Sequence, residues 1–567
     1  MKIVPEEFGK LVFNESAMRK ALSKEVFAKL EQTIKKGESL DSSLAHDVAE
    51  AMKDWAIANG ATHYSHWFQP LTGITAEKHE SFLTTVSSGN PILELSGKEL
   101  IKGEPDASSF PSGGLRSTFE ARGYTAWDPT SYAFIKGNTL CIPTAFCSYG
   151  GHALDKKTPL LRSIEALNKQ ALRLFKVLKM DDVKRIVTNV GPEQEYFLVD
   201  KSMFEKRLDL VLTGRTLYGA PSPKGQELDD HYFGVIKPRV ASFMEEVDRE
   251  LWKLGISAKT EHNEVAPAQH ELANIYTTCN LACDQNQLVM EIMTKIADKH
   301  HFVILFHEKP FEGVNGSGKH NNWSISTDTG INLLSPGDTP FKNQLFLLSL
   351  AAVIKAVDDY QDLLRISVAS ASNDHRLGKN EAPPAIISIF LGDELNGVLE
   401  AIANDDDDYE SHKEKILLGS SVLPSLIKDN TDRNRTSPFA YTGNKFEFRM
   451  PGSNKGVSDA NMVLNTAVAE SLKTFAEILE KSDDVDRTIH SIVKYTIKEH
   501  QKILFSGNGY NDEWVEEANR RGLCNYPTTP DALEHLLDEK NVRLFKEQGV
   551  LKQGETYNRE IVYSFSN

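Results

Sequence analysis

The sequence predicts a folded α+β protein of two or three domains. Its 567 residues are too many for one ordinary hydrophobic core. Apolar residues make up 40% of the chain and charged residues 25%, which is typical of soluble globular proteins and disfavours a fibrous or wholly disordered chain. Stretches with helical spacing alternate with short β-branched stretches, so we expect helices and strands in the same domain.

Residues 1–60 are predicted to form an N-terminal helical segment. The stretches Glu25 to Ile34 and Leu44 to Ala58 carry apolar residues at spacings of three and four, as amphipathic helices do. Asp41 or Ser42 can cap the second helix, because either side-chain oxygen can accept from its first backbone N–H groups.

From about residue 62 to residue 146 the pattern is β-rich. Short apolar or alternating stretches, such as Pro91 to Leu95 and Thr139 to Pro143, are separated by Gly, Pro and Ser turns. We therefore expect a small sheet domain after the helices.

A larger α+β domain is predicted to follow. A long helix from Leu160 to Met180 leads into Arg185 to Val190, a β-branched run that we interpret as a buried strand. Further helices are predicted at Val240 to Leu254, Leu281 to Phe306, Lys342 to Asp358 and Ser458 to Lys481. Surface loops are predicted at Arg215 to Asp230 and Asp405 to Asp408. We interpret residues 501–567 as the start of a C-terminal region, present either as a fragment or in a short form.

Location and redox state follow from simple features. The longest apolar run, Leu345 to Ile354, is far shorter than the roughly 20 residues that cross a bilayer. No apolar stretch follows Lys2, so we expect no secretory signal and a cytoplasmic protein. Five cysteines are an odd number and are expected to be reduced. Cys279 and Cys283, four apart in a predicted helix, are interpreted as core thiols rather than metal ligands.

The net charge of −16 disfavours nucleic acid as a partner. If the protein is an enzyme that acts on anionic substrates, arginine, lysine or metal ions must provide local positive charge at its site, because the protein as a whole is negatively charged. Clustered carboxylates and cations are therefore expected among its motifs.

Two segments carry paired glutamates. Glu193 and Glu195 lie two positions apart on a predicted strand, so their side chains project from the same face. Glu264 and Glu271 flank Pro267 in a segment that we expect to be irregular. Either pair alone is more simply explained as a solvated surface.

Three further segments combine small, polar and charged residues. The segment Gly313 to Ser324 has flexible glycines and His320. This composition would allow the backbone to approach an anion closely, but it is equally typical of a plain glycine-rich turn. The segment lacks the Gly-Lys-Ser/Thr ending of a Walker loop. Lys445, Glu447 and Arg449 alternate with aromatics and share a strand face, which could bind phosphate or form a ladder of ion pairs. Asn373 to Pro384 is a polar segment predicted as a surface loop.

Together and in this order, the segments resemble the glutamine synthetase family. The shared features are Glu-x-Glu, Asn-Glu-Val…Gln-x-Glu, Asn-Gly-Ser-Gly-x-His, Arg-x-x-x-x-Glu-Ala-Pro, and Arg-Asn-Arg followed by x-x-Glu-x-Arg. The sequences from Glu104 to Asp128 and from Phe306 to Phe311 resemble those of the type III branch of this family. The resemblance spans roughly residues 60–530. It implies a small β-grasp-like domain at 61–150, after the helical segment 1–60, and a catalytic domain at 151–500 with a curved antiparallel sheet flanked by helices.

The resemblance implies a site for two divalent metal ions, Mg²⁺ or Mn²⁺, and for ATP. The metal ligands implied are Glu193, Glu195, Glu264, Glu271, His320 and Glu447. Five carboxylates and one imidazole suit hard ions better than thiolate-binding metals. The implied catalytic residues are Asp106, Glu381, Arg435 and Arg449; the glutamate contacts are Asn315, Gly316 and Arg376; the nucleotide contacts are Tyr276, Asn322, Ser324 and Lys445.

The implied reaction joins ammonia to the γ-carboxylate of L-glutamate through γ-glutamyl phosphate. Glutamate, ammonium and ATP are the expected partners, without nucleic acid or membrane, in a homo-oligomer of stacked rings with active sites between subunits. Ala440, Lys445 and Asn322 depart from the commoner short enzymes, and no adenylylated-tyrosine motif is present. The alternatives are a γ-glutamyl-amine ligase and a catalytically silent structural oligomer.

Overall fold

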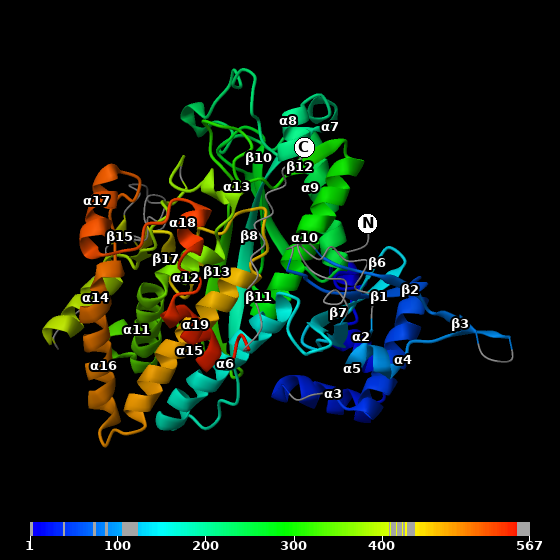
Figure 1. Cartoon of the computed structure of the whole chain (residues 1–567), viewed down its shortest axis with the longest axis horizontal. Coiled ribbons are helices and arrows are strands. Elements are labelled where there is room, and N and C mark those ends of the chain that lie inside the picture. The colour runs from blue at the N-terminus through cyan, green and yellow to red at the C-terminus, as the bar shows by residue number, and fades with distance from the viewer. Residues whose placement is uncertain are drawn as a thin grey trace.

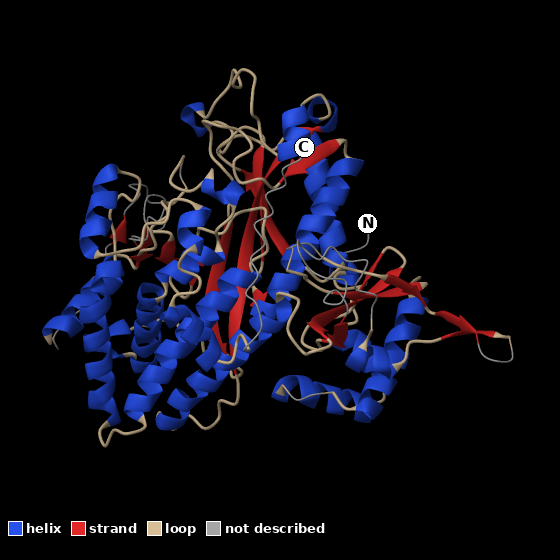
Figure 2. Cartoon of the chain, in the orientation of Figure 1, coloured by secondary structure: helices blue, strands red, loops and turns tan. Residues whose placement is uncertain are grey.

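The computed structural model describes residues 4–37, 40–71, 75–85, 89–104, 123–380, 382–406, 409, 415–416, 422, 426–427 and 437–552 (Figure 1). This part of the chain mixes helices with two main sheets, so the predicted α+β class is confirmed (Figure 2). No helix in these ranges combines the length and apolarity that crossing a bilayer requires.

Four helices open the chain: α1 (Val4–Glu7), α2 (Glu15–Ala21), α3 (Lys24–Lys36) and α4 (Ser42–Ala58). The last two correspond to the predicted pair. Asp41 rather than Ser42 caps α4, since its Oδ1 accepts from the N–H groups of Ser43 and Leu44 at 2.9 and 3.0 Å.

A five-stranded mixed sheet follows. Its strands are β1 (His63–Trp67), β2 (His79–Ser81), β5 (Gly123–Trp127), β6 (Phe134–Lys136) and β7 (Thr139–Ser148), in the order β2-β1-β7-β5 with β6 beside β7. Only β1 and β7 pair in parallel. The helix α5 (Gly97–Lys102) and a separate ribbon of β3 (Leu83–Thr85) and β4 (Pro91–Leu93) complete this region. Val48 and Met52 of α4 share one buried cluster with Leu140 and Ile142 of β7, so helices and sheet have a common core.

The second sheet has nine strands. They are β8 (Ile186–Asp200), β9 (Ala258–Asn263), β10 (Gln269–Asn274), β11 (Thr277–Thr278), β12 (Phe302–Leu305), β13 (Lys319–Thr327), β14 (Ile389–Phe390), β17 (Phe439–Tyr441) and β18 (Phe446–Phe448). Their order is β14-β17-β18-β13-β8-β10-β9, with β11 and β12 also on β8, and all pairs except β14–β17 are antiparallel. The long strand β8 is therefore the axis of the domain (Figure 1). A small ribbon of β15 (Lys415–Ile416) and β16 (Leu426–Ile427) lies apart.

Helices surround this sheet. They are α6 (Lys157–Val177), α7 (Lys201–Phe204), α8 (Leu208–Thr213), α9 (Pro238–Lys253), α10 (Cys279–Lys299), α11 (Gln344–Asp359), α12 (Gln361–Ser367), α13 (Ala371–Asp374), α14 (Asp393–Asn404), α15 (Ser458–Leu479), α16 (Val485–His500), α17 (Asp512–Arg521), α18 (Thr529–Leu533) and α19 (Glu539–Glu547). The predicted helices match α6, α9, α11 and α15 within a few residues. Cys279 and Cys283 are buried free thiols on α10.

The helix predicted over Leu281 to Phe306 is wrong at its end. The helix α10 stops at Lys299, His301 takes a left-handed φ of 59°, and Phe302–Leu305 becomes β12, paired with β8. A short apolar run reads the same in a buried helix and a buried strand, so spacing alone could not place this boundary.

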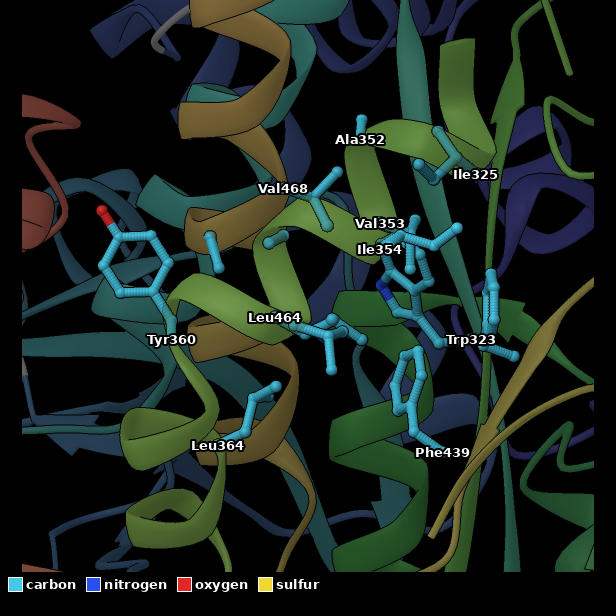
Figure 3. Close-up of a cluster of buried hydrophobic side chains, with 14 of the residues drawn as sticks. Trp323, Ile325, Ala352, Val353, Ile354, Tyr360, Leu364, Phe439, Leu464 and Val468 are labelled. Atoms are coloured by element: carbon cyan, nitrogen blue, oxygen red, sulfur yellow. The ribbon is translucent and has the colours of Figure 1, made fainter. Parts of the chain in front are cut away.

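The strand β13 separates the core from the site. Trp323 and Ile325 point from one face into a cluster with Val353 of α11 and Leu464 of α15 (Figure 3). The Trp323 indole N–H donates to Asn465 Oδ1 at 2.9 Å, which fixes α15 against the sheet. Because side chains alternate along a strand, the residues between these core positions face the other way.

A buried ion cluster joins the two sheet domains. Lys157, at the start of α6, lies 3.0 Å from Asp128 and also binds Asp284 of α10. Gln69, near β1, donates to the Asp284 carboxylate at 2.6 Å. Because all four side chains are buried, the domains are joined by fully formed polar contacts rather than by apolar packing alone.

Candidate active site

One face of the nine-stranded sheet gathers most of the predicted site residues. Antiparallel partners point to the same side of a sheet, and the register pairs Glu271 of β10 with Glu195 of β8, and Glu193 of β8 with His320 of β13. It also pairs Asn322 of β13 with Glu447 of β18. Residues from four strands that are distant in sequence therefore form one polar surface opposite the core.

His320 lies at the centre of a first ligand group. Its Nδ1 is 3.0 Å from Glu193 Oε2 and 3.0 Å from Glu447 Oε1, and the three residues could hold a metal ion. Burial disfavours the charged imidazolium, but hydrogen bonds to the two carboxylates outweigh burial and hold the pKa of His320 well above its usual range. Asn322 donates to Glu193 Oε1 at 2.8 Å and fixes that carboxylate.

A second group contains three carboxylates. Glu195, Glu271 and His320 offer atoms within 4.8 Å of one another, as do His262, Glu264 and Glu271. Burial, and then the charges of Glu195 and Glu271, raise the pKa of Glu264 to about 8. Buried like charges repel each other unless a cation or proton lies among them, so this arrangement fits a divalent ion with oxygen ligands.

The segment that carries Glu264 and Glu271 is a hairpin, in which the irregular stretch expected around Pro267 is confined to the connection, while Glu271 lies on a strand. The strands β9 and β10 pair directly, and residues 264–268 form the connection, with Ala268 at a φ of 64°. Gln269 donates to the Gly316 carbonyl and to Ser317 Oγ, each at 3.0 Å. The proline lies in the connection, where it interrupts no ladder.

A cavity of about 660 Å³ opens beside the carboxylates. It is lined by Glu195, Asp229, Tyr232, Phe233, Glu264, Val265, Gln269, Glu271, Asn315, Gly316, His320, Arg376, Asn380, Ala382, Arg449 and Tyr510. Acidic groups and two arginines therefore meet around one space large enough for a small anionic substrate.

Arg376 is held rigidly at this cavity, and the surface loop predicted for its segment is wrong at this residue. It is only 3% exposed, and its guanidinium donates to the carbonyls of Arg449 at 3.1 Å and Met450 at 3.4 Å. A Cβ on Gly318 would lie 2.1 Å from Arg376 Nη2, so glycine is required for this approach. Arg376 is buried because its segment packs against the residues that follow β18. This is a tertiary contact, and the local sequence does not indicate it.

The predicted nucleotide residues lie toward the other end of β8 and β13. Asn322 pairs with Gly191, and a Cβ on Gly191 would lie 3.2 Å from Tyr276 Cβ. Ser324 follows two positions along β13 on the same face, and Lys445 directly precedes Phe446, the partner of Trp323. The structure thus brings Tyr276, Asn322 and Ser324 to one region, and none of the four predicted nucleotide residues lines the cavity beside the carboxylates.

Three predicted residues, Asp106, Glu381 and Arg435, lie outside the described residues.

Three side chains at the site were missed in the sequence. His262 Nε2 is 3.1 Å from Glu271 Oε1, Gln226 binds Asn315, and Lys309 donates to Asn380 Oδ1 at 2.9 Å. His262 lies on β9 opposite Glu271 of β10, a pairing between strands that the local sequence does not give. Gln226 and Lys309 lie in loops and carry no local signal.

Solved structures share this fold. The chain matches a structure of GmaS without ligand with a TM-score of 0.52 and 14% identity, covering 87% of this chain and 92% of the other. A GmaS/ADP complex matches with a TM-score of 0.53 and 14% identity, covering 88% and 93%. At this identity the likeness defines the class of fold alone, a scaffold of mixed helices and sheet.

Sequence comparisons give the family. Family models match at residues 4–163 ("Glutamine synthetase type III N terminal"), 170–388 ("Glutamine synthetase, catalytic domain") and 488–565 ("Glutamine synthetase C-terminal domain"). A "Type-3 glutamine synthetase" of Dictyostelium discoideum is 51% identical over 561 residues, covering 97% of this chain and 76% of the relative. A "Glutamine synthetase" of Bacteroides fragilis is 51% identical over 537 residues, covering 94% and 74%. The chain belongs to the type III glutamine synthetase family.

Proposed function

We propose that the protein is a glutamate–ammonia ligase, which makes L-glutamine, ADP and phosphate from L-glutamate, ammonia and ATP. The observation that carries this proposal is the shared sheet face, where Glu193, Glu195, Glu271, His320 and Glu447 come together beside a cavity with two arginines. Relatives named glutamine synthetase cover nearly the whole chain and support the same activity.

The two metal ions are proposed to use the two ligand groups. Glu193, His320 and Glu447, which lie close enough together to share an ion, would hold one ion. Glu195, Glu264 and Glu271 would hold the other, since Glu271 lies within ligand distance of Glu195 in one group and of Glu264 in another. Carboxylate oxygens with one imidazole are the donors that Mg²⁺ and Mn²⁺ accept. When bound, the ions would neutralise charge on the phosphoryl group as it moves between ATP and the substrate.

The protein's own cations are proposed to do the rest of the phosphoryl chemistry. A carboxylate is a poor electrophile, so its γ-oxygen first takes the terminal phosphoryl group of ATP, and ADP leaves. Arg449, which lines the cavity, would bind the phosphoryl oxygens, with Arg435 assigned beside it by resemblance. Tyr276, Asn322, Ser324 and Lys445 are proposed to contact the nucleotide.

Glutamate is proposed to lie in the cavity. The buried guanidinium of Arg376 offers a fixed fork for a carboxylate, and Asn315 and Gly316 line the same space. Ammonium must lose a proton before it can attack the acyl phosphate and release phosphate. Asp106 is proposed to hold ammonium, and Glu381 to close the site against water.

The remaining assignments are proposals about organisation. Residues 61–150 would be a β-grasp-like domain, supported by the mixed sheet with β1 parallel to β7 and by α4 packed on it. Residues 151–500 would be the catalytic domain with a curved sheet, between a helical segment at 1–60 and a C-terminal region at 501–567. A homo-oligomer of stacked rings with sites between subunits is proposed from the family. A cytoplasmic location stays a prediction.

The proposal is tested by phosphate release from ATP with glutamate and Mg²⁺ or Mn²⁺, measured with ammonium, with a polyamine, and with neither. Ammonium-dependent release with glutamine formed in equal amount is expected. Release that depends on the polyamine would assign a different ligase, and no release from folded protein would indicate a silent structural relative.

A further inference from the structure

We infer that Gln226, in the loop between α8 and α9, is a positioning residue that orients the Asn315 carboxamide toward the substrate glutamate. The inference rests on the proposed function, because Asn315 is a glutamate contact only if glutamate binds in the cavity. It adds a residue from a segment that the sequence marks only as a surface loop.

Gln226 binds Asn315 with both ends of its carboxamide. Its Nε2 donates to Asn315 Oδ1 at 3.0 Å, and its Oε1 accepts from the Asn315 backbone N–H at 2.5 Å. The two residues are 89 positions apart, and Asn315 is 6% exposed. A paired contact of this kind fixes both the side chain and the backbone of Asn315.

The loop is anchored on both sides of Gln226. Upstream, the Thr216 N–H and hydroxyl both donate to the Pro310 carbonyl, at 2.9 and 3.1 Å. Downstream, His231 Nδ1 contacts the Glu264 carbonyl at 2.5 Å, and Asn263 donates to the His231 carbonyl at 3.2 Å. Gln226 is therefore held against the cavity wall and does not sit on a free loop.

The turn after Gln226 reaches the cavity itself. Leu228 and Asp229 take left-handed φ values of 57° and 50°, which cost conformational energy in residues other than glycine. Asp229, Tyr232 and Phe233 line the cavity. The loop thus forms one wall of the proposed glutamate site, with Gln226 as its link to Asn315.

The direction of the hydrogen bond has a chemical consequence. Because Asn315 Oδ1 accepts from Gln226, the other end of the Asn315 carboxamide is its NH₂ group, a donor. A substrate carboxylate accepts hydrogen bonds and cannot donate them, so this orientation suits glutamate. A glutamate side chain at position 226 has only acceptors when ionised, so it would favour the opposite orientation and present Oδ1 to the substrate.

The experiment compares Gln226→Glu, a near-isosteric change, with the wild-type protein. The KM for glutamate should rise by about tenfold, as expected for losing a charged hydrogen bond, while the KM for ATP changes less than about twofold. The exposed Lys224→Met variant in the same loop should leave both constants unchanged. Unfolding temperatures of the variants should match that of the wild type.

A second background separates orientation from simple charge repulsion. In an Asn315→Ala protein there is no carboxamide to turn, so Gln226→Glu should change glutamate binding, measured by calorimetry, by less than about twofold. An equal loss in both backgrounds, an unchanged KM in the single variant, or a parallel rise in the KM for ATP with a lower unfolding temperature would each overturn the inference. Failure of the proposed function appears separately, as a wild-type protein that makes no glutamine.

Discussion

Glu195 and Glu271 are direct cross-strand partners on β8 and β10, and both residues are only 8% exposed. Directly opposed like charges destabilise a sheet. Among the described residues, the salt bridges of these two glutamates are to His320 and His262, with no lysine or arginine. Without metal, repulsion between the two carboxylates therefore lowers the stability of the sheet. A cation bound between β8 and β10 would remove this repulsion.

Glu264→Ala should abolish the ligase activity with little loss of fold. Removing one carboxylate from a divalent-ion site costs several kcal/mol of transition-state stabilisation, so kcat should fall by roughly a thousandfold or more. Repulsion from Glu195 and Glu271 is relieved at the same time, so the metal-free variant should unfold no earlier than the wild type. Activity and thermal unfolding measure the two effects, with the exposed Glu227→Ala as control. Retained activity would remove Glu264 from the ligands.

The stability of the metal-free protein should fall as pH rises from about 5 to 8. Burial and neighbouring carboxylates raise the pKa of Glu264 from 4.5 to about 8, so in this window the folded state holds a proton that the unfolded chain has released. Stability falls with pH wherever the folded state binds more protons. Mg²⁺ or Mn²⁺ should remove the slope, because metal replaces the proton. Thermal unfolding of Glu264→Gln without metal should show a shallower slope, and equal slopes would contradict the assignment.

Part of the site could be predicted because strand alternation is a local property. Two positions along β8 are enough to place Glu193 and Glu195 on one face. The strand face expected for Lys445, Glu447 and Arg449 holds only for Glu447, because β18 spans Phe446–Phe448. The pairing of Glu271 with Glu195 could not be predicted in this way. Register between strands is set by long-range pairing, and a shift of one residue would turn either side chain to the other face.

The helices were predicted more reliably than the loops. Capping by Asp41 and the spacing of α6, α9, α11 and α15 follow from neighbouring residues. The burial of Arg376 depends instead on Gly318 and on carbonyls more than 70 positions away. The segment containing Gln226 was predicted as a surface loop, since its contact with Asn315 arises only in the folded chain.

Gly318→Ala should weaken glutamate binding. Its Cβ would lie 2.1 Å from Arg376 Nη2, so the guanidinium must move out of its bonds to the Arg449 and Met450 carbonyls. Loss of one bidentate charged contact should raise the KM for glutamate by about tenfold or more. Gly150→Ala is the matched control, because the nearest atom to its Cβ is 3.4 Å away. An unchanged KM would show that Arg376 does not bind the substrate.

Lys309→Met should uncouple ATP use from glutamine formation. Lys309 Nζ donates to the Val314 carbonyl and, at 2.9 Å, to Asn380 Oδ1. Lys309 therefore connects the loop that carries Asn315 to Asn380, the residue before Glu381 in the sequence. If Glu381 closes the site, a looser connection lets water reach the acyl phosphate. The ratio of phosphate released to glutamine formed should rise about two- to fivefold, as modest displacement of a closing segment predicts. Lys379→Met, half exposed in the same segment, should keep the ratio at one; an unchanged ratio in Lys309→Met would argue against the link.

Lys157→Met should destabilise the junction between the two sheet domains. Burial disfavours the charged ammonium, but Asp284 and Asp128 outweigh this and raise the pKa of Lys157. Removing the cation leaves two buried carboxylates without their charge partner, which typically costs about 3–5 kcal/mol. Denaturant unfolding, followed by tryptophan fluorescence, should show a midpoint at a lower denaturant concentration. A second substitution, Asp284→Asn, removes one of the two uncompensated charges and should restore part of the loss. Breaking an exposed pair such as Lys201 with Asp298 should shift the midpoint far less, because water screens it. If Lys157→Met unfolds at the wild-type midpoint, the cluster does not hold the domains together.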